Sequence, residues 1–246
     1  MKKTLSKTIS AVSAMLCFAT AAQAHQLWIE QPVGQNAVIR FGEFGDNLRE
    51  TSPGLLDKFG KPTATLLSAK SKQAAEGRKT DTGFTLPFKT GQGDAIVAED
   101  ASYPLYAFKQ GEKDMKNWYH PAARLITSFT PQEPKLALDI VPAGQPGAFK
   151  LFYKGKAMPK AKVTLVTQSG WIKEGHTDAQ GLVTFDMPWS GTYVAEASHN
   201  ESSSGERPGA KGPEKYDGVS YVTTLTYVKA EGVAPVPAGP VATPNK

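Results

Sequence analysis

Short runs of apolar and β-branched residues recur along the whole chain, separated by Gly, Pro, Asp and Lys. In segments 162–167 (KVTLVT) and 192–197 (TYVAEA) the side chains alternate as a strand with one buried face requires. No segment has the 3.6-residue periodicity of a long amphipathic helix. The pattern therefore predicts an all-β protein.

Residues 25–130 are predicted to form an N-terminal β-domain. Its expected strands are 27–29, 37–41, 63–68, 83–88, 95–99, 105–108 and 122–129. Segment 52–59 is expected to be a loop or a single helical turn. Pro131 and Pro134 lie close together directly after these strands, as prolines do at a domain junction.

Residues 131–229 are predicted to form a C-terminal β-sandwich domain. The seven expected strands are 136–141, 149–153, 162–167, 171–176, 182–186, 192–198 and 219–227. Asp178 and Gly181 mark a turn, because Asp can bond its own backbone and Gly accepts positive φ. Short strands with regular turns indicate a small sandwich.

Three further segments lack a core pattern. The charged runs 70–79 and 206–215 are expected to be solvated loops. Residues 230–246 are rich in Pro and Ala, show no periodicity, and are predicted to be a disordered tail.

The first 24 residues predict a secretory signal peptide. Lys2, Lys3 and Lys7 precede an apolar stretch over 9–22, and segment 22–24 (AQA) gives the small-x-small pattern of a cleavage site. The apolar stretch is too short for a membrane anchor and is diluted by hydroxyl side chains. The mature chain is thus expected to start at His25 and to reside in the bacterial periplasm.

Removing this signal changes the charge and the redox chemistry. Loss of its three lysines lowers the net charge from +5 to +2, which gives no reason to expect nucleic acid or anionic membrane as a partner. Cys17, the sole cysteine, leaves as well, so disulfides and thiolate metal ligands are excluded. No later segment is apolar enough to insert in a bilayer, and the mature chain is expected to be soluble.

Catalytic motifs are scarce. The sequence contains no G-x-S-x-G, phosphate-binding glycine loop, H-E-x-x-H or paired cysteines. His176 precedes Asp178 closely, but both are expected in a solvated turn. The chain is therefore not expected to be an enzyme.

His25 is the first candidate metal ligand. Cleavage before it would free its α-amine, and that amine with the ring Nδ1 can chelate one ion. Such a bidentate nitrogen ligand suits Ni, Co or Cu, whereas Mg and Ca prefer oxygen. The alternative is that His25 merely happens to follow the cleavage site.

His199 and His120 are the other candidate ligands. His199 ends the strand over 192–198 and opens a polar segment, a usual place for a site. His120 lies among aromatic residues beside Trp118 and Tyr119. The alternatives are a solvated loop position for His199 and packing for His120. The spacing of these residues follows no local metal motif.

The start of the mature chain, segment 25–30 (HQLWIE), resembles a family of bacterial periplasmic proteins of unknown function that are linked to nickel and cobalt uptake. Segments 152–163 (FYKGKAMPKAKV) and 177–185 (TDAQGLVTF) look like strands of that family, and 197–199 (ASH) resembles its strand ending in histidine. The second half also resembles transthyretin-like and carboxypeptidase-regulatory-like modules. The resemblance implies two small β-sandwich domains, Ig-like or transthyretin-like, after the signal peptide.

Membership of this family would imply a periplasmic protein that binds a divalent transition metal, nickel or cobalt with copper also fitting, beside a membrane metal transporter. The ion would be held by His25 and His199, with His120 as third candidate. A metal-free sandwich that binds a protein or polysaccharide stays open as the alternative. A copper oxidase with an N-terminal histidine brace is a third hypothesis, which requires a second histidine facing His25.

Overall fold

The computed structural model describes residues 25–209 and 211–245, so the predicted signal peptide lies outside the described residues. Within this part of the chain the elements are strands and a single 3-10 turn, η1 (Leu55–Lys58), which confirms the all-β prediction. No helix here has the length and apolar character needed to cross a bilayer.

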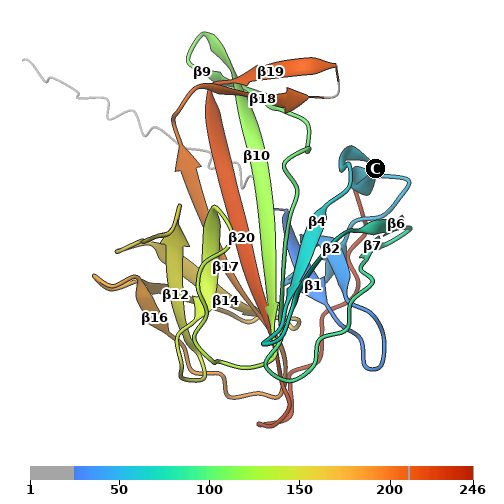
Figure 1. The fold of residues 1–246 in the computed structure, drawn as a ribbon, viewed down its shortest axis with the longest axis vertical. Helices are drawn as coiled ribbons and strands as arrows, with labels where there is room; N and C mark the ends of the chain where they lie inside the picture. Colours follow the sequence, from blue (N-terminus) through green and yellow to red (C-terminus); the bar gives the residue numbers. More distant parts are fainter. Residues whose placement is uncertain (1–24, 210, 246) are drawn as a thin grey trace, which may run out of the picture.

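The largest sheet has nine strands (Figure 1). In spatial order they are β15 (Ile172–His176), β14 (Lys162–Thr167), β17 (Gly191–Glu201), β20 (Gly218–Lys229), β10 (Lys113–Ile126), β8 (Ala95–Glu99), β4 (Thr63–Leu67) and β5 (Lys72–Glu76), with β9 (Tyr106–Gln110) paired to β10. We call it the central sheet.

Three smaller sheets complete the fold. The N-terminal sheet contains β1 (Gln26–Glu30), β2 (Val38–Glu43), β3 (Leu48–Arg49), β6 (Arg78–Thr80) and β7 (Gly83–Thr85). The C-terminal sheet contains β11 (Leu138–Pro142), β12 (Ala148–Tyr153), β13 (Lys156–Ala157) and β16 (Leu182–Thr184). β18 (Gly205–Gly209) and β19 (Gly212–Tyr216) form a separate hairpin.

The two outer sheets cover opposite faces of the central sheet. Side chains alternate along each strand, so neighbours such as Leu125 and Arg124 point to different faces. Leu125 packs with Leu27 of β1 in one buried cluster. Leu225, which pairs with Arg124 in the β10–β20 register, packs with Ile140 of β11 in another. Figure 1 shows the long strands β10 and β20 between the N-terminal sheet and the C-terminal sheet.

The central sheet crosses the predicted domain boundary near residue 130. β10 from the first half and β20 from the second pair in parallel over ten residues, from Asn117–Gly218 to Ile126–Tyr227. The two sandwiches therefore share one sheet. That residues 25–130 and 131–229 are separate domains stays a prediction.

The charged runs that were expected to be loops contain strands instead. β5 and most of β6 lie in the first run, and β18 and β19 lie in the second. Their side chains are largely exposed on both faces. The hydrophobic alternation that reveals a half-buried strand is thus missing, and backbone pairing with β4 or within the hairpin forms these strands.

The structure describes the segment after residue 230 up to residue 245, and its disorder stays a prediction. It runs extended from the end of β20 to the N-terminal sheet (Figure 1), anchored where Ser190 N donates to Val233 O and Asn47 Nδ2 donates to Gly239 O, each at 2.9 Å. Its prolines favour an extended backbone, and hydrogen bonds to the folded sandwiches position it without a core of its own.

A buried ion pair connects the central sheet to the C-terminal sheet. Arg124 of β10 and Asp139 of β11 are both fully buried, and the guanidinium donates two bonds to the carboxylate, at 3.0 Å from Nε and 2.6 Å from Nη2. Asp139 also accepts the backbone N–H groups of Lys135 and Leu136. Asp139 therefore pairs with the buried guanidinium and also accepts hydrogen bonds from the backbone that leads into β11.

Removal of one partner is expected to leave a buried, unpaired charge. Asp139→Ala should lower the free energy of unfolding by about 3–5 kcal/mol, because Arg124 would stay buried without its carboxylate. Glu174→Ala, which removes the exposed pair with Lys162, is the matched control and should cost less than about 1 kcal/mol. Urea unfolding measures both, and equal losses would contradict the role assigned to Asp139.

Candidate functional site

His25 lies directly before β1, which crosses the strands of the central sheet. The Tyr119 hydroxyl donates to its carbonyl oxygen, and Thr224 Oγ1 donates to Leu27 O at 2.7 Å. The imidazole packs against Phe41, with ring centroids 5.1 Å apart, and its side chain is 12% exposed. Both the backbone and the ring of His25 are therefore held by the fold.

Two carboxylates flank this imidazole. Glu50 Oε1 lies 2.6 Å from Nε2, and the Glu50 side chain is fully buried. Glu43 Oε1 lies 3.2 Å from Nδ1. That Glu43 oxygen is buried and has no hydrogen-bond partner within the described chain.

Strand register explains how residues far apart in sequence meet here. Gln26 pairs with Gly42, so one further step in the antiparallel ladder brings His25 opposite Glu43. Gly42 pairs in turn with Arg49, and Glu50 N donates to Phe41 O at 2.8 Å. The β2–β3 hairpin thus delivers both carboxylates to His25.

Gly42 makes this hairpin possible. Its φ is +141°, and a Cβ at this position would lie 2.3 Å from Leu48 O. Only glycine permits this backbone conformation and the close approach of β3 without a shift.

The end of the tail contacts the same carboxylate. Asn245 donates from its backbone N to Glu50 Oε2 at 3.0 Å and from Nδ2 to Glu50 Oε1 at 2.6 Å. Glu50 therefore has three donors, counting His25, and its position is fixed from both sides.

The surroundings of His25 are rich in acid groups. Burial raises the pKa of Glu43, and hydrogen bonding to Asp46 raises it further. Burial also raises the pKa of Glu196 to about 7, against hydrogen bonding from Gln26, which lowers it. A cation at this position would compensate several carboxylates that oppose one another's ionisation.

A cleft of about 510 Å³ opens beside His25. Four of its lining residues are aromatic, namely Phe41, Tyr103, Tyr106 and Tyr119. Three others are polar residues of the central sheet, namely Ser198, Asn200 and Ser220. We call this hollow the aromatic cleft.

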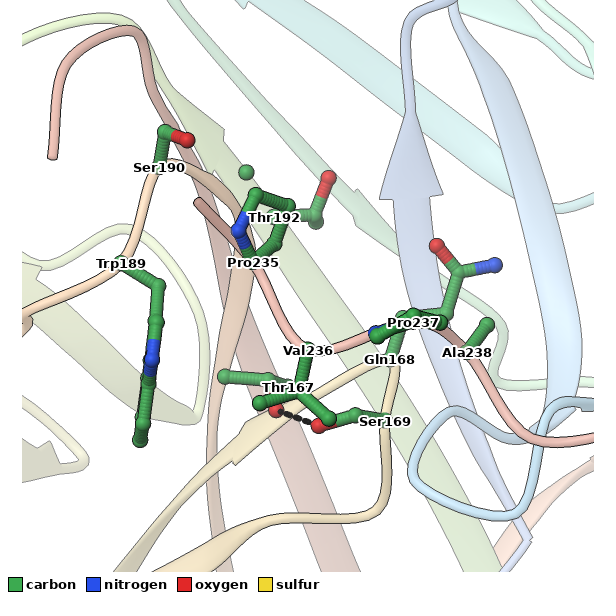
Figure 2. Close-up of a pocket in the computed structure, with 11 residues that line it drawn as sticks. Thr167, Gln168, Ser169, Trp189, Ser190, Thr192, Pro235, Val236, Pro237 and Ala238 are labelled. Carbon is green, nitrogen blue, oxygen red and sulfur yellow. Dashed lines mark hydrogen bonds between the residues drawn. The ribbon is translucent and has the colours of Figure 1, made fainter. Parts of the chain in front are cut away.

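A smaller hollow of about 240 Å³ lies under the tail (Figure 2). Pro235 and Pro237 pass over it, Trp189 stands at one end, and Thr167 is hydrogen-bonded to Ser169 at 2.9 Å. None of its lining residues carries a charged or imidazole side chain. It therefore offers less chemistry than the aromatic cleft.

The structure does not bring His199 and His120 to His25. His199 packs on Tyr153, with centroids 4.3 Å apart, and pairs with Tyr221, whereas its neighbours Ser198 and Asn200 line the aromatic cleft. Because alternate residues of a strand point to opposite faces, the central sheet separates His199 from His25.

His120 lies on the same side as His199. Its ring stacks on Trp118 at 4.9 Å, its Nε2 lies 3.1 Å from Glu99 Oε2, and its neighbour Tyr119 faces the cleft instead. His176 ends the outermost strand β15 and is exposed. The predicted convergence of His25, His199 and His120 on one ion is therefore not what the fold provides.

Glu43, Glu50 and Asn245 were not among the residues predicted from sequence. The sequence offered one signal for the first two, because segment 38–50 carries a strand, a Gly pair and a return strand that fold back beside β1. Nothing in a Pro/Ala-rich tail indicates the position of Asn245. Within the described chain, no three His, Cys, Asp or Glu side chains converge as metal ligands.

The fold and the site define an all-β protein with two sandwiches on one sheet and a histidine held between two carboxylates. The chain belongs to the family described as "Domain of unknown function (DUF4198)", whose model matches residues 22–201. No curated protein matches the chain. Among solved structures, the two fibronectin type-III domain segment from chicken tenascin is 11% identical, with 80% of this chain and 96% of that chain covered, at a TM-score of 0.21.

Glu196 gives the site a stability signature that depends on pH. Between pH 4.5 and about 7 the folded state keeps the proton of Glu196, whereas the unfolded state loses it. Stability from this group is therefore lost as the pH rises through that window. Gln does not ionise, so the Glu196→Gln variant should escape this loss. Its free energy of unfolding relative to the wild type should therefore rise by up to about 3 kcal/mol between pH 5 and pH 8.

Urea unfolding at the two pH values measures this gain. Glu174→Gln, on the exposed edge strand β15, is the control and should show no such change. The same difference between Glu196→Gln and wild type at both pH values would contradict the assignment.

Proposed function

We propose that this protein is an exported metal-binding protein in which His25 and Glu43 hold one divalent transition-metal ion. The observation that carries the proposal is the 3.2 Å separation between His25 Nδ1 and the orphaned, buried Glu43 Oε1. Two donors that each lie about 2.1 Å from one ion, at an angle of 90–110°, are roughly 3.0–3.4 Å apart.

Glu50 supports this role of the imidazole. The contact from Nε2 is the shorter of the two and involves a fully buried carboxylate, which favours the tautomer with the proton on Nε2 and the lone pair on Nδ1. A histidine that binds a metal ordinarily donates its other N–H to a carboxylate in this way. Asn245 then fixes the orientation of Glu50.

Processing would supply the third donor. Cleavage after Ala24 frees the α-amine of His25, which closes a chelate ring with Nδ1 of the same residue. The donor set is then two nitrogens and one carboxylate oxygen. Such a set suits nickel, cobalt or copper better than calcium or magnesium.

The wider role that we propose is carriage of nickel or cobalt in the periplasm, beside a membrane transporter for the metal. It rests on the resemblance of segment 25–30 and on the predicted signal peptide. This proposal retains His25 from the predicted ligand set and replaces His199 and His120 by Glu43, because those histidines face the other side of the central sheet.

Calorimetric titration of the processed protein with Ni²⁺ tests the ligand assignment, after intact mass has shown that the chain begins at His25. His25→Ala and Glu43→Gln should each weaken binding by roughly 100-fold or more, and Glu50→Gln by about 10–100-fold. One extra alanine before His25 should weaken binding as well, because it removes the amine and leaves the ring intact.

His199→Ala is the matched control and should leave the affinity unchanged. If His199→Ala abolished binding while Glu43→Gln did not, the proposed ligand set would be wrong. If the wild type bound nickel no more tightly than His25→Ala, His25 would not be a ligand and the metal proposal would fail, which leaves the alternative of a metal-free sandwich that binds a protein or polysaccharide.

A further inference from the structure

We infer that the ion at His25 is bound as a complex with a small, flat, unsaturated organic chelator that occupies the aromatic cleft. This inference rests on the proposed function and names the form in which the metal is recognised. Three features of the described chain carry it: an incomplete protein donor set, a preformed aromatic wall, and the absence of cationic side chains around the cleft.

The protein alone leaves positions on the ion open. After cleavage His25 Nδ1, its amine and Glu43 Oε1 would provide three donors, and within the described residues no group of three His, Cys, Asp or Glu side chains could complete the set. Nickel and copper bound by nitrogen and oxygen prefer four or more ligands in square-planar or tetragonal arrangements. At least one further donor has to come from water or from a bound molecule.

His25 is one of the residues that line the aromatic cleft, so a molecule bound there would contact this histidine. The cleft volume of about 510 Å³ lies in the range of small-molecule sites, which is roughly 300–1,000 Å³. A hydrated ion needs no such cavity, whereas a chelator of one or two rings would occupy it.

The aromatic wall is rigid before any ligand arrives. Tyr103 contacts Phe59 at 4.8 Å and Tyr119 at 5.2 Å, both edge to face, and Phe41 contacts Phe59 at 4.6 Å. Tyr119 is also held by its hydrogen bond to His25 O. Aromatic rings fixed in this way offer stacking surface to a flat ring with little loss of conformational entropy.

Charge restricts the class of complex. None of the described lining residues is Lys or Arg, and the carboxylates of Glu43 and Glu50 lie beside His25. An anionic complex would be repelled, so the bound species is neutral or cationic. Ser198 and Asn200, both exposed on β17, can form hydrogen bonds to heteroatoms at the rim of the chelator.

A pair of matched nickel complexes tests the inference. Ni²⁺ with one equivalent of bipyridine and Ni²⁺ with one equivalent of ethylenediamine each present two nitrogen donors, but only bipyridine carries flat aromatic rings. Processed protein should bind the bipyridine complex about 10-fold more tightly than the ethylenediamine complex. A tenfold difference in affinity corresponds to roughly 1.4 kcal/mol, which stacking of the flat rings on the aromatic side chains can supply.

Variants of the wall locate the effect. Tyr103→Ala should remove the preference for bipyridine, and Tyr103→Phe should retain it. Tyr106→Ala, at a residue that is 43% exposed, tests the wall without touching the core. Tyr153→Ala, on the opposite face beside His199, is the control and should change nothing.

The outcomes separate the two proposals. If the processed protein fails to bind Ni²⁺ in any form, the proposed function fails. If it binds Ni²⁺ but takes both complexes with equal affinity, or keeps the preference in both Tyr103→Ala and Tyr106→Ala, metal binding stands and the chelator inference is overturned.

Discussion

The parallel pairing of β10 with β20 is the constraint on which the rest of this structure depends. It joins a strand of the first half to the last strand of the second. The strands of both halves therefore form one nine-stranded sheet, which the two sandwiches share. Side chains on neighbouring strands must then share two common faces. One face receives β1 and the aromatic cleft, and the other receives the C-terminal sheet with Arg124 and Asp139.

This division of faces determines which residues can act together. The long strands bring Tyr119, Ser198 and Ser220, which are far apart in sequence, to one cleft. The same strands send His120 and His199 to the other side, where they pack among aromatic rings. The side chains around His25 consequently come in part from the N-terminal sheet, where the β2–β3 hairpin brings Glu43 and Glu50 beside it by register.

Sequence patterns predict the strands that have buried residues on one or both faces. The bounds of β8 (Ala95–Glu99) and β14 (Lys162–Thr167) match the prediction, because the buried residues in each contrast with their polar flanks. Strands exposed on both sides, such as β5, carry no such contrast and are not predicted by the pattern. His25 can be identified from sequence because the cleavage pattern lies directly before it. The positions of Glu43 and Glu50 beside His25 depend instead on the pairing between strands. The side of the central sheet on which His199 lies is set by which outer sheet packs on that side. No local sequence pattern indicates this packing.

The central claim is that one imidazole, from His25, binds the ion together with carboxylate oxygen. X-ray absorption of the processed protein loaded with one equivalent of Ni²⁺ tests it most directly, because the outer-shell scattering of an imidazole ring counts the histidine ligands. The account predicts a single imidazole in a nitrogen and oxygen shell, and loss of that imidazole signal in His25→Ala. Two or more imidazoles, or a spectrum unchanged in His25→Ala, would contradict it.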